Sequence, residues 1–139
     1  MKNLCKGLAV LGVAVLLAPT ARAADSVPNF NKRGDSEKRF VERVADTIVQ
    51  KAHKSVVDID VRSYKFKETK PGRTNLVMEI GYKGRLTGKS YTAKVTVKLD
   101  TSDRDKWEVD RIDYEDNNNV PYSKTGMLDL VKEFNKASR

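Results

Sequence analysis

The segment LDTSDRDKWEVD, residues 99–110, concentrates groups that could bind a cation or transfer a proton, since it holds five carboxylates in twelve residues. A calcium loop needs oxygen ligands at alternate positions, a glycine at its tight turn and a bidentate Glu. Asp103 and Asp105 alternate, but Lys106 and Trp107 occupy the next two positions, and the segment has no glycine. Asp, Ser and Thr side chains favour turns because they hydrogen-bond the local backbone. We therefore expect a hairpin turn here and no calcium site.

Asp58 and Asp60 form a second acidic pair, which could bind a metal ion or act as acid and base. They alternate with Val57, Ile59 and Val61, and such alternation is typical of a strand with one buried and one solvated face. We therefore expect both carboxylates on the exposed side of a strand.

His53 is the only histidine in the chain, and Cys5 is the only cysteine. Zinc and copper sites draw on several such ligands, so the composition disfavours both metals. His53 falls at the expected end of a helix, where a positive charge is favourable, and we expect that role rather than ligation or base catalysis. The sequence therefore predicts no catalytic residue, no metal and no cofactor.

Residues 1–23 have the pattern of a secretory signal peptide. Two lysines precede an unbroken apolar run at residues 8–17, and a small-residue cleavage site ends at Ala23. The run is shorter than the ~20 residues that cross a bilayer, so we expect cleavage after Ala23 rather than an anchor. Cys5 leaves with the signal, and a cysteine-free domain fits a bacterial periplasm better than a disulfide-rich secretory route. We expect a periplasmic or secreted protein with no transmembrane segment after cleavage.

The remaining chain predicts one domain after a short lead-in. Residues 24–34 contain Pro28 and Gly34 and predict an exposed, flexible segment. Residues 35–139 suit a single modest core. Apolar residues recur at helical spacing from Ser36 to about His53, which predicts a helix with one buried stripe.

Four strands and a second helix follow. A period of two predicts the strands, with phase slips near Ser63 and Arg111 that indicate bulges. Short connections predict an antiparallel meander. The expected fold class is α+β, in which an N-terminal helix packs on a curved four-stranded antiparallel meander, with a C-terminal helix from about residues 123–125. The hairpin alignment predicts opposite charges at paired positions, with Lys98 facing Glu108 and Glu79 facing Lys94.

The final expected strand, KWEVDRIDYED, resembles that of cystatin-like and NTF2-like small exported domains. Many of these carry a Trp-x-Val-x-x-Ile pattern, matched here by Trp107, Val109 and Ile112. The resemblance covers residues 36–116 and implies a helix on a strongly bent sheet. The Gln-x-Val-x-Gly hairpin of cystatin inhibitors is absent, because Gln50 is followed by Lys-Ala-His, which argues against a protease inhibitor of that type.

A second resemblance is to the periplasmic phospholipid-carrier proteins of the toluene-tolerance group, which also follow such a strand with a short link and a helix. Their usual Gly-Val-Ser after the strand is replaced by Asn118-Asn119-Val120, and this chain is much shorter.

Large inward side chains are the candidates for a ligand pocket on the concave face, although the same residues could simply fill the core. These candidates are Tyr64, Met78, Tyr82, Tyr91, Trp107 and Tyr114. The resemblance to NTF2-like enzymes implies an Asp and a Tyr inside the cone of the sheet. The inward positions are nearly all apolar, however, and we expect no carboxylate on the face of the tyrosines.

The middle of the chain is basic, since residues 61–98 hold ten basic and two acidic side chains, whereas residues 99–120 hold three and eight. Cations at the turns could contact an anionic partner, or could only keep the sheet edge soluble. The candidates are Lys65, Lys67, Lys70, Arg73, Lys83, Arg85 and Lys89. Nucleic acid is disfavoured as a partner because no aromatic residue is interleaved on the outer face.

Together these features predict a small non-catalytic exported binding module for a protein partner or a small apolar ligand. One alternative is an anion- or lipid-binding envelope protein, whose partner would be an envelope protein or an anionic envelope component. The other is an NTF2-like enzyme, which an inward carboxylate would favour.

Overall fold

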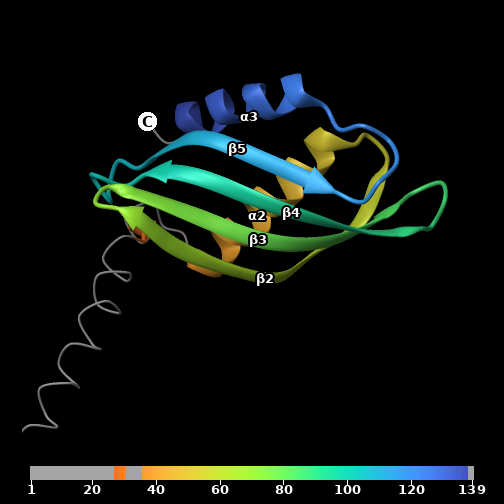
Figure 1. Cartoon of the computed structure of the whole chain (residues 1–139), viewed down its shortest axis with the longest axis horizontal. Helices are drawn as coiled ribbons and strands as arrows, with labels where there is room; N and C mark the ends of the chain where they lie inside the picture. Colours follow the sequence, from red (N-terminus) through yellow and green to blue (C-terminus); the bar gives the residue numbers. More distant parts are fainter. Residues whose placement is uncertain (1–26, 31–35, 138–139) are drawn as a thin grey trace, which may run out of the picture.

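The computed structural model describes residues 27–30 and 36–137. The expected signal peptide, residues 1–23, lies outside them, as do parts of the expected lead-in. The helices and strands follow in the order α2 (Glu37–Ala52), β2 (Val56–Lys70), β3 (Arg73–Gly84), β4 (Ser90–Asp100), β5 (Glu108–Asp116) and α3 (Lys124–Ala137) (Figure 1).

The four strands form one antiparallel sheet in the order β2-β3-β4-β5, which confirms the expected meander. The sheet curves around α2, and α3 runs along β5 (Figure 1). The side chain of Asn135 on α3 pairs with the open edge of β5, since its Oδ1 accepts from the Val109 amide at 2.7 Å and its Nδ2 donates to the Val109 carbonyl at 2.9 Å. The expected α+β class is therefore confirmed.

Helix α2 begins where the sequence provides a cap. The Ser36 hydroxyl accepts a hydrogen bond from the Arg39 amide at 3.2 Å, and Glu37 places negative charge in the first turn. One stripe of the helix is buried, and it comprises Phe40, Val41, Val44, Ala45, Ile48, Val49 and Ala52. The helix ends at its C-cap, His53.

The inner face of the sheet supplies the other half of the core. Its side chains alternate along the strands as expected, and the buried ones are Leu76, Met78, Ile80, Tyr82, Ala93, Val95, Val97, Leu99, Val109, Ile112 and Tyr114. Met127 and Leu130 of α3 join the same cluster. Burial of this apolar surface is the main stabilising contribution to the fold.

The register shifts where the sequence changes phase. The β2–β3 pairing shifts between Val61 and Ser63, and the β4–β5 pairing shifts at Lys98, opposite Arg111. Both expected bulges are thereby confirmed, and a further shift lies around Asp58, which adopts φ 54. Bulges increase twist and bend a strand, so they explain how the sheet curves around the helix.

One expected cross-strand pair is confirmed and one is wrong. Glu79 lies opposite Lys94, as expected. Lys98 lies opposite Arg111 rather than Glu108, because Glu108 pairs with Asp100 and the bulge then adds one residue to β5. The Lys98 ammonium instead lies 3.7 Å from Asp113, two residues beyond its direct partner Arg111. Lys98 therefore pairs with an opposite charge diagonally across the two strands.

The acidic segment forms the expected turn between β4 and β5. Asp100 Oδ1 accepts from the Ser102 amide at 3.1 Å and from its hydroxyl at 2.6 Å. These hydrogen bonds lower the pKa of the Asp100 carboxyl. Asp103 accepts from the Asp105 amide at 3.0 Å. Within residues 27–30 and 36–137, no group of His, Cys, Asp and Glu is arranged to hold a metal ion.

Residues 27–30 are not the exposed lead-in that the composition predicts. Phe30 is buried, with its ring centroid 4.8 Å from that of Phe40. The Asn29 amide donates to the Arg104 carbonyl at 3.0 Å, and Arg104 Nε donates to the Val27 carbonyl at 2.7 Å. The β4–β5 turn therefore holds this segment against the core.

None of the helices in the described ranges is long and apolar enough to cross a membrane.

Candidate functional site

A carboxylate points inward at the end of β5, and it organises the candidate site. The Asp116 side chain is only 5% exposed. Its Oδ2 lies 2.7 Å from His53 Nε2 and accepts from the hydroxyls of Tyr82 at 2.8 Å and Tyr114 at 2.7 Å. Its Oδ1 accepts from the Asn118 amide at 3.2 Å. We call these five residues the Asp116 cluster.

Four parts of the fold meet in this cluster. Tyr114 and Asp116 are two positions apart on β5, so both side chains lie on the inner face. Tyr82 comes from the end of β3, and Asn118, which follows β5, donates from Nδ2 to the Tyr82 hydroxyl at 3.2 Å. His53 comes from the C-terminus of α2, where its amide donates to the Val49 carbonyl. Its ring stacks on Tyr82 with the centroids 5.8 Å apart.

The hydrogen bonds keep the buried Asp116 carboxylate ionised. Burial by itself would raise the pKa of Asp116, but the hydrogen bonds from Tyr114, His53 and Tyr82 together outweigh it, and the pKa is lowered. Burial raises the pKa of Tyr82 to about 12 and also raises that of Tyr114. Around neutral pH, both tyrosines are therefore hydrogen-bond donors to a carboxylate that only accepts.

This network also determines the tautomer of His53. Because an ionised carboxylate has no proton to donate, Nε2 of His53 must carry the hydrogen. In the neutral ring, Nδ1 is then a hydrogen-bond acceptor and a base. This second nitrogen makes no hydrogen bond to the part of the chain that the structure describes.

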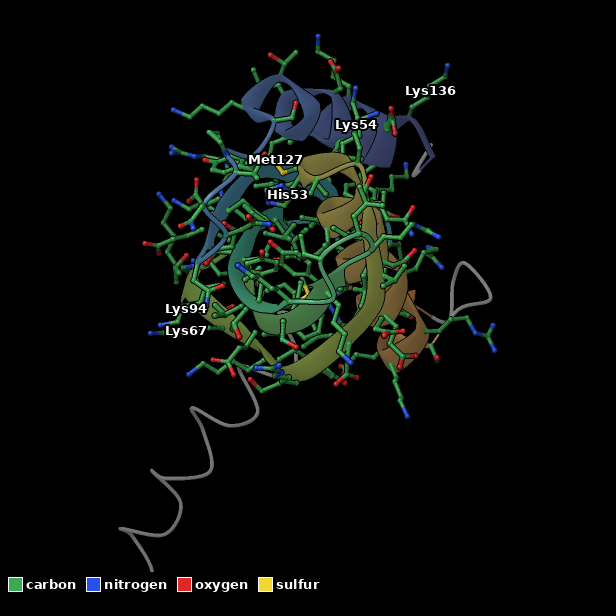
Figure 2. The ribbon with its side chains drawn as sticks, turned by 90° about the vertical axis from the view of Figure 1, so that its right-hand side faces the viewer. His53, Lys54, Lys67, Lys94, Met127 and Lys136 are labelled. Carbon is green, nitrogen blue, oxygen red and sulfur yellow. The ribbon has the colours of Figure 1, made fainter. Side chains whose placement is uncertain are left out.

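A hollow of about 810 Å³ lies against the exposed edge of the cluster, and His53 and Asn118 are among its walls. We call it the His53 hollow. It is bounded by the end of α2, the β3–β4 hairpin and the link from β5 to α3. Its apolar walls are Val56, Leu86, Tyr91, Val120, Pro121 and Tyr122. Figure 2 looks onto this end of the molecule, and His53 lies near Met127 beneath α3.

A second hollow, of about 890 Å³, lies on the sheet and is lined by all four strands. Its inward members, such as Met78 and Val95, are buried, so its accessible walls are the outer-face residues between them. These walls include the paired Glu79 and Lys94, and cross-strand pairing already accounts for such charges. We therefore take the His53 hollow as the candidate site.

The structure separates the six expected pocket residues. Tyr82 and Tyr114 belong to the Asp116 cluster, and Tyr91 lines the His53 hollow. Met78 and Trp107 are core residues with 2% and 4% exposure. The remaining candidate, Tyr64, is half-buried near the other end of the sheet, where its hydroxyl donates to Glu37 at 2.9 Å, and this hydrogen bond raises its pKa.

The seven expected anion contacts divide between the two ends of the sheet. Lys65, Lys67, Lys70 and Arg73 lie on or near the β2–β3 turn, whereas Lys83, Arg85 and Lys89 lie at the β3–β4 turn. Arg73 is neutralised by Asp110 and by Asp100. Lys67 points outward from the sheet, away from His53 (Figure 2). The candidates therefore do not form one patch, and only the second group lies on the hairpin whose Gly84, Leu86 and Thr87 line the His53 hollow.

One sequence-based expectation about this site is wrong. A carboxylate does share the face of the tyrosines, because Asp116 continues the inward alternation that passes through Tyr114. His53 ends a helix, as expected, and it is in addition buried against Asp116. The expected exposure of Asp58 and Asp60 agrees with the structure. The Tyr-x-Asp spacing at the end of β5 was the signal that could have revealed the cluster.

No family model, curated protein or solved structure matches this chain. The chemistry of the His53 hollow therefore follows from its own walls. They offer apolar surface, several hydroxyl groups and a histidine whose ring is held in a fixed orientation. Such a site can accept a hydrogen bond from a ligand or remove a proton from it.

Proposed function

We propose that this chain is a small exported binding protein that holds a small, largely apolar ligand in the His53 hollow. The ligand would place a hydrogen-bonding head group against Nδ1 of His53. The observation that carries the proposal is the two-sided environment of this ring. Nε2 is anchored to a buried carboxylate, while Nδ1 makes no hydrogen bond to the described chain and His53 is among the walls of a hollow.

The dimensions and walls of the hollow support a small ligand. Pockets for small molecules are typically about 300–1,000 Å³ and mostly apolar, with few oriented polar groups. The His53 hollow, at about 810 Å³, falls within this range. Tyr91 and Tyr122 contribute apolar ring surface, and each is held by another ring, since Tyr91 packs on Tyr82 at 5.4 Å and Tyr122 on Tyr114 at 5.0 Å.

The rigidity of the polar group supports binding rather than a purely structural role. A polar group that is already oriented loses little entropy when it meets a ligand. The His53 ring is held by Asp116 on one edge and by the Tyr82 ring on one face. A structural histidine would need only the first of these contacts.

The inward Asp116 also favours a second candidate function, an enzyme that uses His53 as a general base. A carboxylate behind one ring nitrogen orients a histidine whose other nitrogen removes a proton. The two functions share the site, but they differ in outcome. A binding protein releases its ligand unchanged, whereas an enzyme converts it.

Native mass spectrometry of the protein, purified gently from its exported fraction, tests the proposal. We expect a reproducible extra mass, which would also identify the class of ligand. Ser55→Phe places a ring in the hollow without touching the Asp116 cluster and should abolish the extra mass. Ser63→Phe places the same ring in the second hollow, on the sheet, and is the matched control. This variant should retain the extra mass.

Two results would overturn the binding proposal. The first is a bare wild-type monomer or dimer, which would leave a module that binds a protein partner or its own copy. The second is an extra mass that persists in Ser55→Phe. A compound that is chemically altered when incubated with the wild type, but not with His53→Gln, would establish the enzyme instead.

A further inference from the structure

Exposed apolar side chains gather at the mouth of the His53 hollow. In the described ranges, three large hydrophobic residues are exposed, and they are Leu86 at 88%, Val120 at 61% and Leu128 at 67%. Leu86 and Val120 both line the hollow, although they come from different segments, the β3–β4 hairpin and the link after β5. Single exposed hydrophobic side chains are common, but two that line the same hollow call for an explanation.

Cations outnumber carboxylates beside the same opening, where Asp129 is the acidic wall of the hollow and Asp58 lies 4.0 Å from Lys83. The hairpin from Lys83 to Lys89 carries three cations and no carboxylate. Arg85 and Lys89 have no ion-pair partner within 4.0 Å among the described residues, unlike Arg73 at the opposite end of the sheet. Lys54, next to His53, adds a further exposed cation at this end (Figure 2).

The hairpin holds its tip in a defined position. The Gly84 amide donates to the Lys89 carbonyl at 3.0 Å, and the Gly88 amide donates to the Gly84 carbonyl at 2.9 Å. The Arg85 amide donates to the Ser55 carbonyl at 2.9 Å, which ties the hairpin to the segment after α2. Leu86 therefore stands out from a fixed base.

We propose that the mouth of the His53 hollow docks on an anionic lipid surface. Leu86 and Val120 would enter the boundary between headgroups and acyl chains, and Arg85, Lys89 and Lys54 would contact lipid phosphates. Shallow insertion of apolar side chains combined with attraction of nearby cations is how peripheral proteins bind such surfaces. The proposal rests on these exposed residues and does not require that the hollow holds a ligand.

The arrangement favours a lipid surface over a protein partner. A protein interface is usually built around a continuous apolar centre with close shape complementarity. Here the two exposed apolar residues come from separate segments that line a hollow, so they do not form a continuous apolar centre. A lipid surface deforms around separate insertion points, and its phosphates are available at any position around the mouth.

Co-sedimentation with vesicles tests the proposal. The chain is purified from the exported fraction, and its start at Ala24 is checked by mass. Vesicles are pure phosphatidylcholine or a mixture with phosphatidylglycerol. We expect binding that requires phosphatidylglycerol and weakens with added salt, because salt screens exposed charges.

Matched variants locate the contact. Since each cation near an anionic surface contributes about fivefold in affinity, the double change Arg85→Gln with Lys89→Gln should weaken binding about 25-fold. Leu86→Ser should weaken it about tenfold. The controls remove the same groups elsewhere, with Lys65→Gln and Lys67→Gln on β2 and Leu128→Ser on α3. Each control should change binding less than twofold.

Three results would overturn the proposal. They are no binding to phosphatidylglycerol vesicles, equal binding to phosphatidylcholine alone, and equal losses in the mouth variants and their controls. All variants begin at the same residue, so the N-terminus cannot cause a difference in vesicle binding between them. Thermal unfolding checks that Leu86→Ser folds. If it does not fold, the double variant Arg85→Gln with Lys89→Gln still tests the proposal. Native mass spectrometry of the charge variant separates this proposal from ligand binding, since the extra mass should remain.

Discussion

Nε2 of His53 lies 2.7 Å from Oδ2 of Asp116, although the two residues are 63 positions apart in the chain. Their side chains are 6% and 5% exposed. The contact joins the end of the first described helix to the end of the last strand. Because a buried polar network is stable only when its members are paired, this contact makes the cluster a structural junction. Two of its members, His53 and Asn118, also line the hollow.

Asp116→Asn should destabilise the protein most near neutral pH. Three hydrogen bonds to a charged acceptor would become bonds to a neutral one, at a cost of ~1 kcal/mol each, or ~3 kcal/mol in all. The native pKa of Asp116 lies below its ordinary value, so its contribution is complete above ~pH 4 and is lost as the pH falls through the native pKa. Urea unfolding should therefore show the variant and the wild type converging in acid.

Asp113→Asn is the control for that measurement. Asp113 lies on the outer face of the same strand, where it pairs with Lys98 and Arg111 in solvent. Exposed ion pairs contribute ~0–1 kcal/mol, so this change should have a small effect. A gap between Asp116→Asn and wild type that stays constant from neutral to acid pH would contradict the assignment of an ionised Asp116.

Tyr82→Phe should change the behaviour of the protein in alkali. Burial raises the pKa of Tyr82 to about 12, whereas an unfolded tyrosine ionises near ~10. The stability that Tyr82 contributes is therefore complete below ~pH 10 and is lost as the pH rises through about 12. The variant should lose ~1–2 kcal/mol at neutral pH and decline less steeply above ~pH 10.

Urea unfolding of Tyr82→Phe at several alkaline pH values measures that slope. Tyr122→Phe is a matched control, because its ring packs on Tyr114 but lies outside the Asp116 cluster. If Tyr82→Phe and wild type lost stability in parallel from ~pH 10 upwards, the buried, protonated role of the Tyr82 hydroxyl would be wrong.

Phe30→Ala should destabilise the whole domain, although Phe30 lies in a segment that looks like a linker. Its ring contacts those of Phe40, Phe66 and Trp107. Removal of a buried aromatic ring costs ~3 kcal/mol. Leu86→Ala removes an exposed side chain and should change the unfolding free energy by less than ~0.5 kcal/mol. Equal denaturation midpoints for the two variants would mean that residues 27–30 do not pack on the core in solution.

The fold could be predicted from local patterns because each element carries its own signal. The helical period of α2, the alternation in β4 and the slips at Ser63 and Arg111 depend only on neighbouring residues. The exact pairing of Lys98 could not be predicted, because it depends on where β5 begins to pair with β4 and on which strand accommodates the extra residue of a bulge.

The candidate site could be predicted only in part. Tyr82 and Tyr114 were expected on the inner face, since alternation determines the side of a strand. The contact between His53 and Asp116 depends on where the end of α2 meets the end of the sheet, which no local pattern encodes. Phe30 was missed for the same reason, because its partners come from α2, β2 and the turn after β4.

Gly72 and Gly88 have similar backbone conformations, but only Gly72 packs against another turn. Comparing Gly72→Ala with Gly88→Ala therefore separates the cost of lost packing from the cost of the backbone conformation. Gly72 and Gly88 have φ of 78 and 68, a region that costs an L-residue ~1–2 kcal/mol. A Cβ at Gly72 would lie 3.2 Å from Ser102 Cβ, whereas one at Gly88 would meet nothing within 4 Å. Gly88→Ala should therefore show the conformational cost alone. Gly72→Ala should lose ~1 kcal/mol more, because the β4–β5 turn must move. Urea unfolding of both variants measures the difference, and equal losses would show that the two turns do not pack closely.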